Sequence, residues 1–526
     1  MRGSIGLALL AVLAVAAPAV AQPAFPSARG FGAGVTGGRG GQVLHVTTLA
    51  ASGQGSLAWA VAQSGPRYVV FDVSGVITGD VEITSGDITI AGQTAPGAGI
   101  TINGHLTTPY GVRLGNIIVR HVRVRPNPPD GTWGPEQHDA IQFSSANHIL
   151  LDHVDVSHGV DENVDLWDGA HHITVQASVI AFANPAGGHP DGAHNFCLLN
   201  SDGSIGGGNA GGRISILGNL FAHCRTRTPA LSIGPAEVIG NVSYDVREGF
   251  VHHNPAYGDF VIAGNTYRDG ASASLVPFWF DPEQGAPVPT RYFLGGNAID
   301  DPGVFTGTVD DPYASSAFTA AYTFALGSLQ RSQFAGLAGA PIWTEAGYLA
   351  PERPAAADAY TSVLDCAGAW PRDAITQRAV TETRDRTGQF ANLPVNDLLA
   401  GLTPSAAPAD RDRDGMPDAW ESAHGLDPDT GDHNAVLVSG YPAIEQYLNE
   451  LADSLTPCAE PTDPGTDGGL GTDGGNNAGG GSPGGCCDAR GGGASSLPVL
   501  GIALGLAVIG RRRGRGWSCP FTGERS

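Results

Sequence analysis

The sequence predicts an all-β solenoid, a parallel β-helix, and three observations support this fold class. Short apolar segments recur between about residues 30 and 300, at steps of 22 to 41 residues, as strands do in a solenoid or a sandwich. No clear helical pattern separates them. Gly-Asn recurs at the same place within several segments, and stacked asparagine side chains can hydrogen-bond along a solenoid axis. The segments begin at Ile88, Ile117, Ile149, Ile173, Ile214, Val238 and Phe260.

The first 21 residues are typical of a secretory signal peptide rather than of a buried first helix. Arg2 supplies the charged start, an apolar run covers residues 5–17, and Ala19-Val20-Ala21 forms a small-residue cleavage site. We expect the β-helix domain to occupy residues 22–345. Its Gly-Asn pairs are expected to stack on neighbouring coils through Asn219, Asn241, Asn265 and Asn297.

The chain after the solenoid divides into parts of different composition. An alanine-rich stretch at 355–366 and an amphipathic stretch at 441–455 predict two helices. An apolar run followed by an arginine cluster near the end is typical of a membrane or sorting tail rather than of a buried helix. The expected parts are a packing segment at 346–400, an EF-hand-like calcium module at 401–455, a flexible Gly/Asp-rich linker at 456–494, the tail at 495–515 and a terminal segment at 516–526.

The charge of the chain restricts its partners. The formal net charge is −23, from 51 acidic and 28 basic residues, which argues against binding nucleic acid because phosphates demand a basic face. An acidic substrate would need a bridging cation or a local arginine patch. All 28 basic residues are arginine, so a mechanism that depends on lysine is excluded.

Seven cysteines are present, and export would permit disulfide bonds among them. Cys197 and Cys224 form one candidate pair on neighbouring coils, and Cys366 and Cys458 form another. Spacing alone does not fix connectivity, so both pairings stay open at this point.

A twelve-residue segment has the spacing of an EF-hand calcium loop. Acidic residues occupy loop positions 1, 3, 5, 9 and 12, with Gly415 at position 6, and position 7 contributes a backbone carbonyl in such loops. The alternative is a solvated acidic turn. We expect a structural rather than a catalytic ion here, with the ligands Asp410, Asp412, Asp414, Met416, Asp418 and Glu421.

A second set of carboxylates lies in the solenoid. Asp161 and Asp165 are four residues apart across a turn, and Asp139 precedes them by one coil. Adjacent coils lie about 4.8 Å apart, so all three could face one hard cation such as Ca²⁺. Taken singly, each aspartate is more readily explained as a turn residue or a cap, so the interpretation rests on their stacking.

Arg227 is a candidate functional arginine. It is followed by Thr228-Pro229, and the proline fixes its own φ and favours an extended conformation at Thr228. The backbone after Arg227 is therefore expected to be rigid. A surface arginine in a coil turn is the alternative.

These residues carry a family resemblance that covers about residues 25–450. The chain resembles extracellular pectate lyases of polysaccharide lyase family 1, which implies a right-handed parallel β-helix, calcium bound by Asp139, Asp161 and Asp165, and Arg227 as the base. Asp152 and His153 resemble a recurrent structural pair of that family. The matching segments, in order, are FPSARGFGAGVTGGRGGQVLHVTTL, GPRYVVFDVSGVI, ITIAGQTAPGAGITI, HDAIQF, LLDHVDVSHGVDENVDL, NLFAHCRTRTP and DRDGMPDAWESAHGLDP.

The sequence departs from that family at three positions. Gln137 stands where an acid is frequent, Asp191 where a substrate-binding lysine is expected, and Ser232 where many members have a second arginine. Other side chains are then needed to contact an acidic polysaccharide, unless the substrate is less charged than polygalacturonate. The candidates are Arg225, Arg120, Arg123, Arg125 and His194.

The implied reaction is β-elimination on pectate or a related uronan. Calcium would acidify the C5 proton of the uronate, Arg227 would take that proton, and the product would be 4,5-unsaturated. The alternatives are a glycoside hydrolase with Asp161 and Asp165 as its acid pair, and a non-catalytic surface protein that binds glycans. We expect a monomer whose end, which resembles a myxobacterial sorting signal, contacts the membrane or sorting machinery.

Overall fold

The fold is that of a computed structural model, which describes residues 22–126, 138–190, 192–201, 211–281, 286–322, 330–390 and 397–458. The predicted signal peptide, the predicted sorting tail and terminal segment, and residues 459–494 of the predicted linker lie outside the described residues. Gln137 and Asp191 lie outside them too. In the described part, no helix is both long and apolar enough to cross a membrane.

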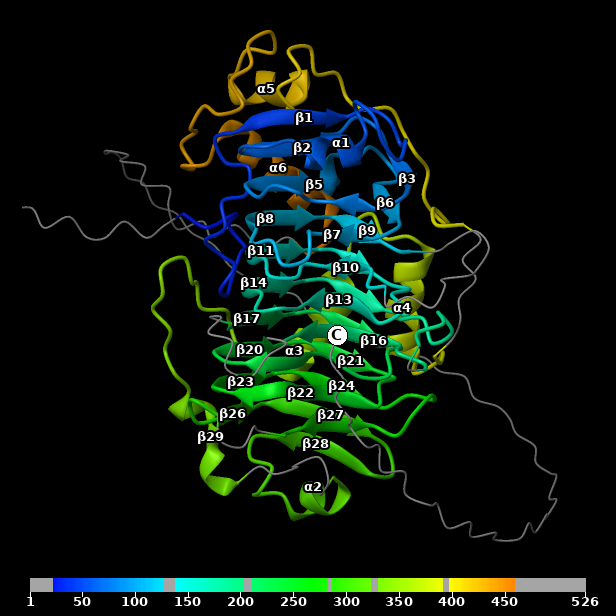
Figure 1. The fold of residues 1–526 in the computed structure, drawn as a ribbon, viewed down its shortest axis with the longest axis vertical. Coiled ribbons are helices and arrows are strands. Elements are labelled where there is room, and N and C mark those ends of the chain that lie inside the picture. The colour runs from blue at the N-terminus through cyan, green and yellow to red at the C-terminus, as the bar shows by residue number, and fades with distance from the viewer. Residues whose placement is uncertain are drawn as a thin grey trace, which may run out of the picture. The chain divides into compact units, whose positions relative to one another are not determined.

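The chain forms a parallel β-helix in which each coil adds one strand to each of three sheets in turn (Figure 1). Neighbouring strands of a sheet pair in parallel, and the exception in the described part is the antiparallel pair of the last two strands of the second sheet. The predicted parallel β-helix is thereby confirmed.

The strands of the first sheet are β1 (Gln42–Val46), β2 (Arg67–Phe71), β5 (Ile88–Ala91), β8 (Gly115–Arg120), β11 (Asn147–Asp152), β14 (His171–Gln176), β17 (Gly212–Leu217), β20 (Ala236–Ile239), β23 (Asp259–Ala263), β26 (Arg291–Gly295) and β29 (Phe334–Gly336). Those of the second sheet are β3 (Gly75–Thr78), β6 (Ile100–Asn103), β9 (Val122–Val124), β12 (Asp155–Val156), β15 (Val179–Ala181), β18 (Leu220–Ala222), β21 (Val242–Tyr244), β24 (Thr266–Arg268), β27 (Asn297–Asp301) and β28 (Phe305–Val309). Those of the third sheet are β4 (Val81–Glu82), β7 (Leu106–Thr107), β10 (Ile141–Gln142), β13 (Glu162–Leu166), β16 (Phe196–Asn200), β19 (Ala230–Ile233), β22 (Glu248–Tyr257) and β25 (Val276–Trp279).

Each predicted apolar segment from residue 117 onward holds two strands of two different sheets. Residues 117–124 contain β8 and β9, separated by His121 at φ +53°, and His153 at φ +50° separates β11 from β12 in the same way. Gly218 takes this place in a later coil, at φ +61°. One left-handed residue turns the chain without a polar spacer. The apolar pattern therefore continues through the turn, and the boundary between the two strands cannot be recognised in the sequence.

The asparagines of the Gly-Asn pairs form a ladder inside the solenoid. Asn219 Nδ2 donates to Asn241 Oδ1 over 3.0 Å, Asn241 to Asn265 over 3.0 Å, and Asn265 to Asn297 over 2.9 Å. All four side chains are almost fully buried. Because each amide also donates to a backbone carbonyl, the polar groups are satisfied within the core. The predicted stacking is confirmed.

Apolar side chains that point inward from the three sheets form one continuous core. Ile117, Ile149, Ile173 and Ile214 pair in register across four successive coils and are fully buried. Each buried side chain of this size contributes roughly 1.5–3 kcal/mol by leaving water. Stacked, like residues therefore hold the coils together along the solenoid axis.

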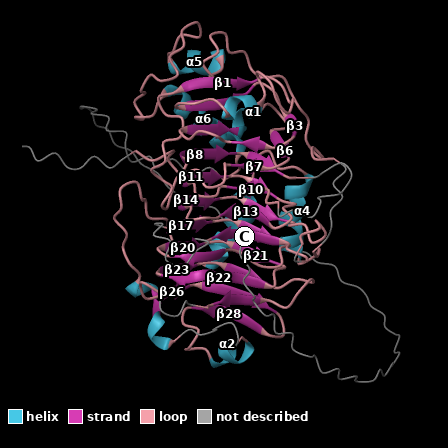
Figure 2. Cartoon of the chain, in the orientation of Figure 1, coloured by secondary structure: helices cyan, strands magenta, loops and turns pink. Residues whose placement is uncertain are grey.

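Helices lie on the outside of the strands (Figure 2). α3 (Ala356–Cys366) and α4 (Ala374–Asp385) pack on the second sheet, and α6 (Ala443–Leu455) packs on β2 and β5 of the first. The two predicted helices match α3 and α6, whereas α4 was not predicted. The other helices are α1 (Leu57–Val61), α2 (Ser316–Ala321), α5 (Asp418–His424) and the short 3-10 helices η1 (Gly92–Thr94), η3 (Arg331–Gln333) and η4 (Leu337–Gly339).

Both candidate disulfide pairs are formed. Cys197 and Cys224, on neighbouring coils, are bonded inside the solenoid. Cys366, at the end of α3, is bonded to Cys458, which follows α6, and this bond closes a segment with a sequence separation of 92 residues. The second bond therefore joins the two helical parts of the C-terminal segment.

Glu237 generates a pH-dependent prediction. Burial raises the pKa of its carboxyl to about 7, although hydrogen bonds from Ser215 and Tyr348 oppose the shift. The usual pKa of a glutamate is 4.5. The contribution of Glu237 to folding stability is therefore complete below pH 4.5 and is lost as the pH rises through about 7. Glu237→Gln should leave the melting temperature nearly unchanged at pH 5 and raise it by several degrees at pH 8. A lower melting temperature for the variant at pH 8 would contradict this account.

Candidate active site

The three predicted carboxylates meet at the third sheet. Asp165 lies on β13 and pairs in register with Gln142 of β10, while Asp139 and Asp161 lie just before these two strands. The backbone N–H of Glu162 donates to Asp139 Oδ1 over 2.8 Å. Carboxylate oxygens of Asp139, Asp161 and Glu162 lie within 4.8 Å of one another. The parallel register therefore brings Asp139 to Asp161 and Glu162 of the next coil, whereas the third predicted ligand, Asp165, is not a member of this close group.

The negative charge of these carboxylates is poorly balanced by neighbouring cations and hydrogen-bond donors. Burial, and then repulsion from Asp161, hold the pKa of Asp139 well above its usual range. Burial and the charge of Asp139 do the same to the pKa of Asp165, although the Gln142 side chain donates a hydrogen bond to it. Asp161 Oδ1 and Asp165 Oδ1 are buried and make no hydrogen bond to the described protein. Buried oxygens of this kind are suited to binding a hard cation.

Arg227 points its guanidinium group at this cluster. The group forms an ion pair with Glu162 and lies 4.3 Å from the centre of the Phe196 ring. Burial lowers its pKa to about 10, although the charges of Asp161 and Asp139 act in the opposite direction. Its backbone has φ +62°, which non-glycine residues adopt rarely and mostly where the surroundings impose it.

Glu162 was not singled out from the sequence. It lies between Asp161 and Asp165, and its side chain is 3% exposed. Its position beside two predicted ligands was the only signal available, because its ion pair with Arg227 links residues from different coils. Glu162 therefore joins the acids to the candidate base.

Two other predicted side chains lie at the edge of the cluster. His194 stacks on His189 with ring centres 3.7 Å apart, and His189 Nε2 is 3.5 Å from Asp161 Oδ2. Arg225 is partly exposed and donates from Nη1 to the carbonyl of Ala193 over 3.2 Å. Both are thus placed near the carboxylates without being part of them.

The other three predicted substrate contacts are buried elsewhere, so that prediction is wrong for them. Arg120 is bonded to Asn449 of α6 over 3.0 Å. Arg123 and Arg125 pair with Asp373, which caps the N-terminus of α4. None of the three is more than 5% exposed. They hold the C-terminal helices on the first and second sheets, and exposure cannot be read from an alternating Arg-x-Arg pattern alone.

The predicted calcium loop precedes and enters α5. Oxygens of Asp410, Asp412 and Asp414 lie within 4.8 Å of one another. The side chain of Met416 is fully buried in a cluster with Ile444 of α6. Because this side chain has no oxygen, Met416 could bind calcium only through its backbone carbonyl.

Asp418, at position 9 of the loop, is oriented differently from expectation. Its two carboxylate oxygens accept hydrogen bonds from the N–H and the Nε of Arg411, over 2.9 and 2.8 Å. The carboxylate is therefore engaged by a neighbouring cation, and among the described acids it joins neither close group of this loop.

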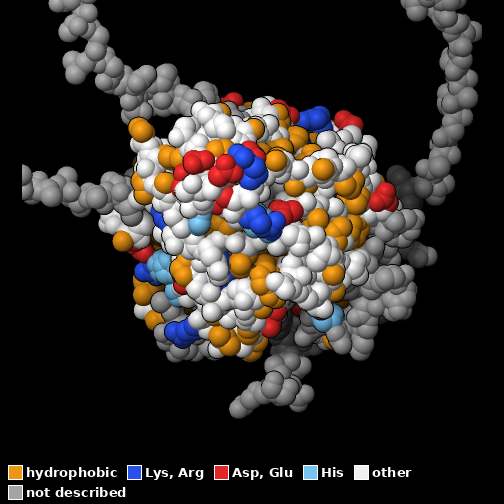
Figure 3. Space-filling model, turned by 90° about the horizontal axis from the view of Figure 1, so that it is seen from above, with side chains coloured by type: hydrophobic (Ala, Val, Ile, Leu, Met, Phe, Trp, Pro, Cys, Tyr) orange, Lys and Arg blue, Asp and Glu red, His pale blue; other side chains and the backbone are white. Residues whose placement is uncertain are grey.

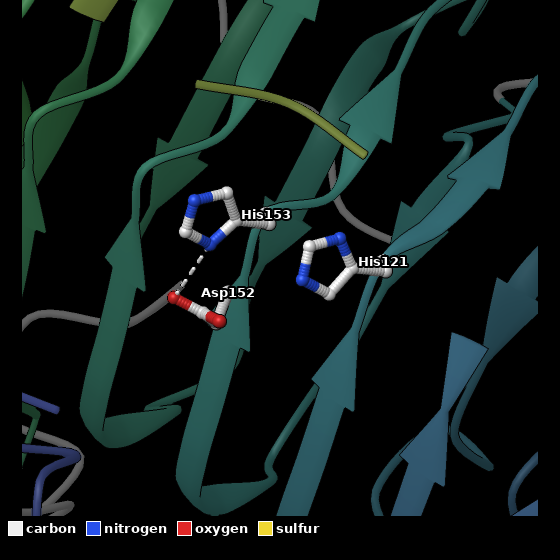
Figure 4. A group of neighbouring side chains, drawn as sticks. All are labelled: His121, Asp152 and His153. Atoms are coloured by element: carbon white, nitrogen blue, oxygen red, sulfur yellow. Dashed lines mark ion pairs between the residues drawn. The ribbon is translucent and has the colours of Figure 1, made fainter. Parts of the chain in front are cut away.

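A third cluster joins His121, Asp152 and His153 on neighbouring coils (Figure 4). It is unsuited to a metal ion for two reasons. His121 Nδ1 accepts a hydrogen bond from the N–H of Trp370, so the neutral ring carries its proton on Nε2, the nitrogen that would have to bind the metal. Asp152 is already paired with Arg120 over 2.9 Å. This cluster is a buried structural network.

Comparison with known proteins identifies the family. No protein-family model matches the chain. A protein of Neosartorya fischeri named "Probable pectate lyase C" is 33% identical over 457 residues, which cover 85% of this chain and 98% of the relative. An Aspergillus fumigatus protein of the same name is 34% identical over 463 residues, with the same coverage. The chain belongs to the pectate lyase family. The enzyme is thus a polysaccharide lyase.

One solved structure, of a thermostable pectate lyase, covers 66% of this lyase and 97% of its own chain. It has a TM-score of 0.46 at 14% identity, and at these values the likeness adds nothing to the family assignment.

The structural network of Asp152 can be tested by mutation. Burial opposes its ionisation, yet the charges of His153 and Arg120 hold the pKa of Asp152 well below its usual range. Asp152→Asn should lower the free energy of unfolding by about 3–5 kcal/mol, because Arg120 is left buried without its partner. The loss, measured by denaturant titration, should be the same with calcium and with a chelator. A loss that depends on the chelator would instead indicate a metal site.

Asp365→Asn is the matched control for that measurement. Asp365 pairs with Arg384, and both side chains are about half exposed. Removing an exposed pair changes stability little.

Proposed function

We propose that the enzyme cleaves pectate or a related uronan by calcium-dependent β-elimination. The observation that carries the proposal is the guanidinium of Arg227, which is largely shielded from water and lies beside the carboxylate cluster of Asp139, Asp161 and Glu162. A base next to hard-oxygen ligands suits an acidic substrate, and with a net charge of −23 a bridging cation or a local arginine is needed to hold it.

The residues present fit calcium. Asp139, Asp161 and Asp165 offer oxygens only, from two adjacent coils, and two of those oxygens are buried without a hydrogen-bond partner. Burial, and then repulsion between carboxylates, raises the pKa values of Asp139 and Asp165, and a divalent cation would remove that repulsion. These three residues would hold the ion, and the substrate carboxylate would complete its coordination. Calcium bound there supplies a Lewis acid that makes the C5 proton of the uronate more acidic.

Arg227 takes the C5 proton in this mechanism. Arginine ordinarily stays protonated, but burial lowers the pKa of Arg227 to about 10. At pH 9 roughly a tenth of such a group is neutral. Asp161 and Asp139 raise this pKa, and their effect weakens when a cation balances their charge. After proton transfer, the Glu162 carboxylate stabilises the guanidinium, while the C4–oxygen bond breaks and the 4,5 double bond forms. The leaving oxygen takes the bonding pair and is protonated from water.

The remaining predicted contacts would hold the substrate. Arg225 is partly exposed near the cluster, and His194 lies at its edge beside His189. We assign them to binding of neighbouring sugar units, since Arg225 is partly exposed and His194 stacks on the histidine that lies next to Asp161.

The loop from Asp410 to Glu421 is proposed to bind a separate, structural calcium ion. Four of its five acids, all except Asp418, belong to two close groups, and the buried Glu421 makes no hydrogen bond through either carboxylate oxygen. A buried carboxylate without a partner is costly unless a cation balances it.

Secretion is also part of the proposal. The signal-peptide pattern of residues 1–21 and the two disulfides support it, because such bonds persist in oxidising compartments. The tail at 495–515 would hold the enzyme at the cell envelope.

The calcium site can be tested through Asp165. Asp165→Asn should lower turnover and raise the calcium concentration for half-maximal activity at least about tenfold, because a charged ligand is lost. The assay follows the ultraviolet absorbance of unsaturated products from pectate. Asp168→Asn is the matched control, because Asp168 instead accepts a hydrogen bond from Ser145. An unchanged calcium response in Asp165→Asn would refute the assignment.

The base can be tested by comparing two lysine substitutions. Arg227→Lys should lower turnover at least about a hundredfold, because lysine lacks the planar guanidinium. Arg225→Lys should mainly raise KM. Turnover of the parent should rise with pH towards about 10, since the base must lose its proton. If Arg225→Lys loses turnover and Arg227→Lys keeps it, the two roles are reversed.

A further inference from the structure

The proposed calcium loop lies against the first coil of the solenoid, at the end that carries β1 and α5 (Figure 1). The carbonyl of Arg413 accepts a hydrogen bond from His45 of β1 over 3.1 Å. A side chain on Gly415 would come within 2.9 Å of Val43, also on β1. The loop and the first strand are therefore in direct contact. Seen from this end, acidic and basic side chains lie side by side among mostly uncharged atoms (Figure 3).

Glu421 is the strongest sign of a ligand in this region. It is 0% exposed, and neither of its carboxylate oxygens makes a hydrogen bond to the described protein. One of these oxygens lies within 4.8 Å of carboxylate oxygens of Asp414 and Asp432. Calcium takes oxygen ligands at about 2.3–2.6 Å, so ligands on opposite sides of one ion are about 4.8 Å apart. The oxygens of Glu421, Asp414 and Asp432 are therefore close enough together to be ligands of one calcium ion.

Asp432 lies outside the twelve-residue loop. Its N–H donates to Asp414 Oδ2 over 3.1 Å, and its Oδ1 is buried without a hydrogen-bond partner. Two close acidic groups share Asp414: one contains Asp410 and Asp412, and the other contains Glu421 and Asp432. All the acids of these two groups belong to the twelve-residue EF-hand pattern except Asp432.

We propose that Asp432 is a ligand of the cation of this loop, and that the bound cation fixes the segment after α5 to the first coil. The inference rests on the proposed structural calcium. Asp418, at position 9, is held by Arg411, so the loop alone supplies fewer carboxylates than its spacing suggests. Asp432 supplies the missing charge from another part of the chain.

The residues after Asp432 transmit the effect to the solenoid. Asn434 Nδ2 and His433 Nε2 both donate to the carbonyl of Gly41, over 3.0 and 3.1 Å. Gly41 directly precedes β1. The carbonyl of His433 also accepts from the N–H of Ile444 on α6, over 3.0 Å. Fixing Asp432 at a cation therefore restrains a segment that is bonded to both β1 and α6.

Calcium binding to the full protein tests the ligand by titration calorimetry. Glu421→Gln should abolish one binding component, which identifies it as that of the loop. Asp432→Asn should weaken the same component at least about tenfold. Asp429→Asn is the matched control, because Asp429 lies three residues away, is 66% exposed and pairs with Arg411; it should leave the affinity unchanged.

The possible failures are distinguishable. If no component depends on Glu421, the structural calcium itself is refuted, and this inference with it. If Glu421→Gln loses the component while Asp432→Asn binds as the parent does, Asp432 is not a ligand although the loop calcium stands. Turnover at saturating calcium verifies that each variant is folded, and Asp432→Glu should restore part of the affinity if a carboxylate is what the ion requires.

Hydrogen exchange tests the attachment to the first coil. Calcium should slow exchange in peptides from β1 and β2 of the parent, relative to a chelator, and this protection should be largely lost in Asp432→Asn. Peptides from β17 and β20 should not respond to that substitution. Equal protection of β1 in the parent and in Asp432→Asn would overturn the proposed attachment.

Discussion

Everything in this molecule depends on the parallel pairing of successive coils. Backbone hydrogen bonds hold neighbouring coils about 4.8 Å apart, so a side chain meets the one that is a whole coil away in sequence. The same register stacks Ile117 on Ile149 in the core and aligns the asparagine ladder. It also brings Asp139 to Glu162 and Arg227. The hydrophobic core, the asparagine ladder and the candidate active site therefore all result from the same register between successive coils.

Burial of charge separates the structural arginines from the candidate base. Arg120 and Arg125 are buried and balanced by buried aspartates: Arg120 pairs with Asp152, and Arg125 pairs with Asp373. Such pairs are costly to form and more costly to break, which suits the fastening of α4 and α6 to the sheets. Arg227 is different, because its partner Glu162 belongs to a cluster with surplus negative charge. That charge raises the pKa of Arg227, but burial lowers it by more, so the guanidinium holds its proton less firmly than in water.

The sequence predicted the solenoid fold and most of the candidate site. Most of the features that it did not predict depend on contacts between residues far apart in the chain. Strand recurrence predicted the solenoid, and like residues one coil apart predicted both the ladder and the acid trio. The corners at His121 and His153 were missed, because a single left-handed residue leaves no gap in an apolar run. The burial of Arg120, Arg123 and Arg125 was missed too, since it depends on helices hundreds of residues later. Glu162 and Asp432 likewise matter only through partners on other coils or segments.

The disulfide between Cys366 and Cys458 changes how a solenoid of this kind comes apart. Repeat folds lose their end coils independently, because each coil contacts only its neighbours. Here α3 packs on coils around β21 and β24, whereas α6 packs at β2 and β5, and the disulfide joins the two helices covalently. The helices and the bond form a strap along the outside of several coils. Unfolding of the first coil would then disturb contacts made by α3 many coils away. The strap therefore makes the unfolding of these coils more cooperative.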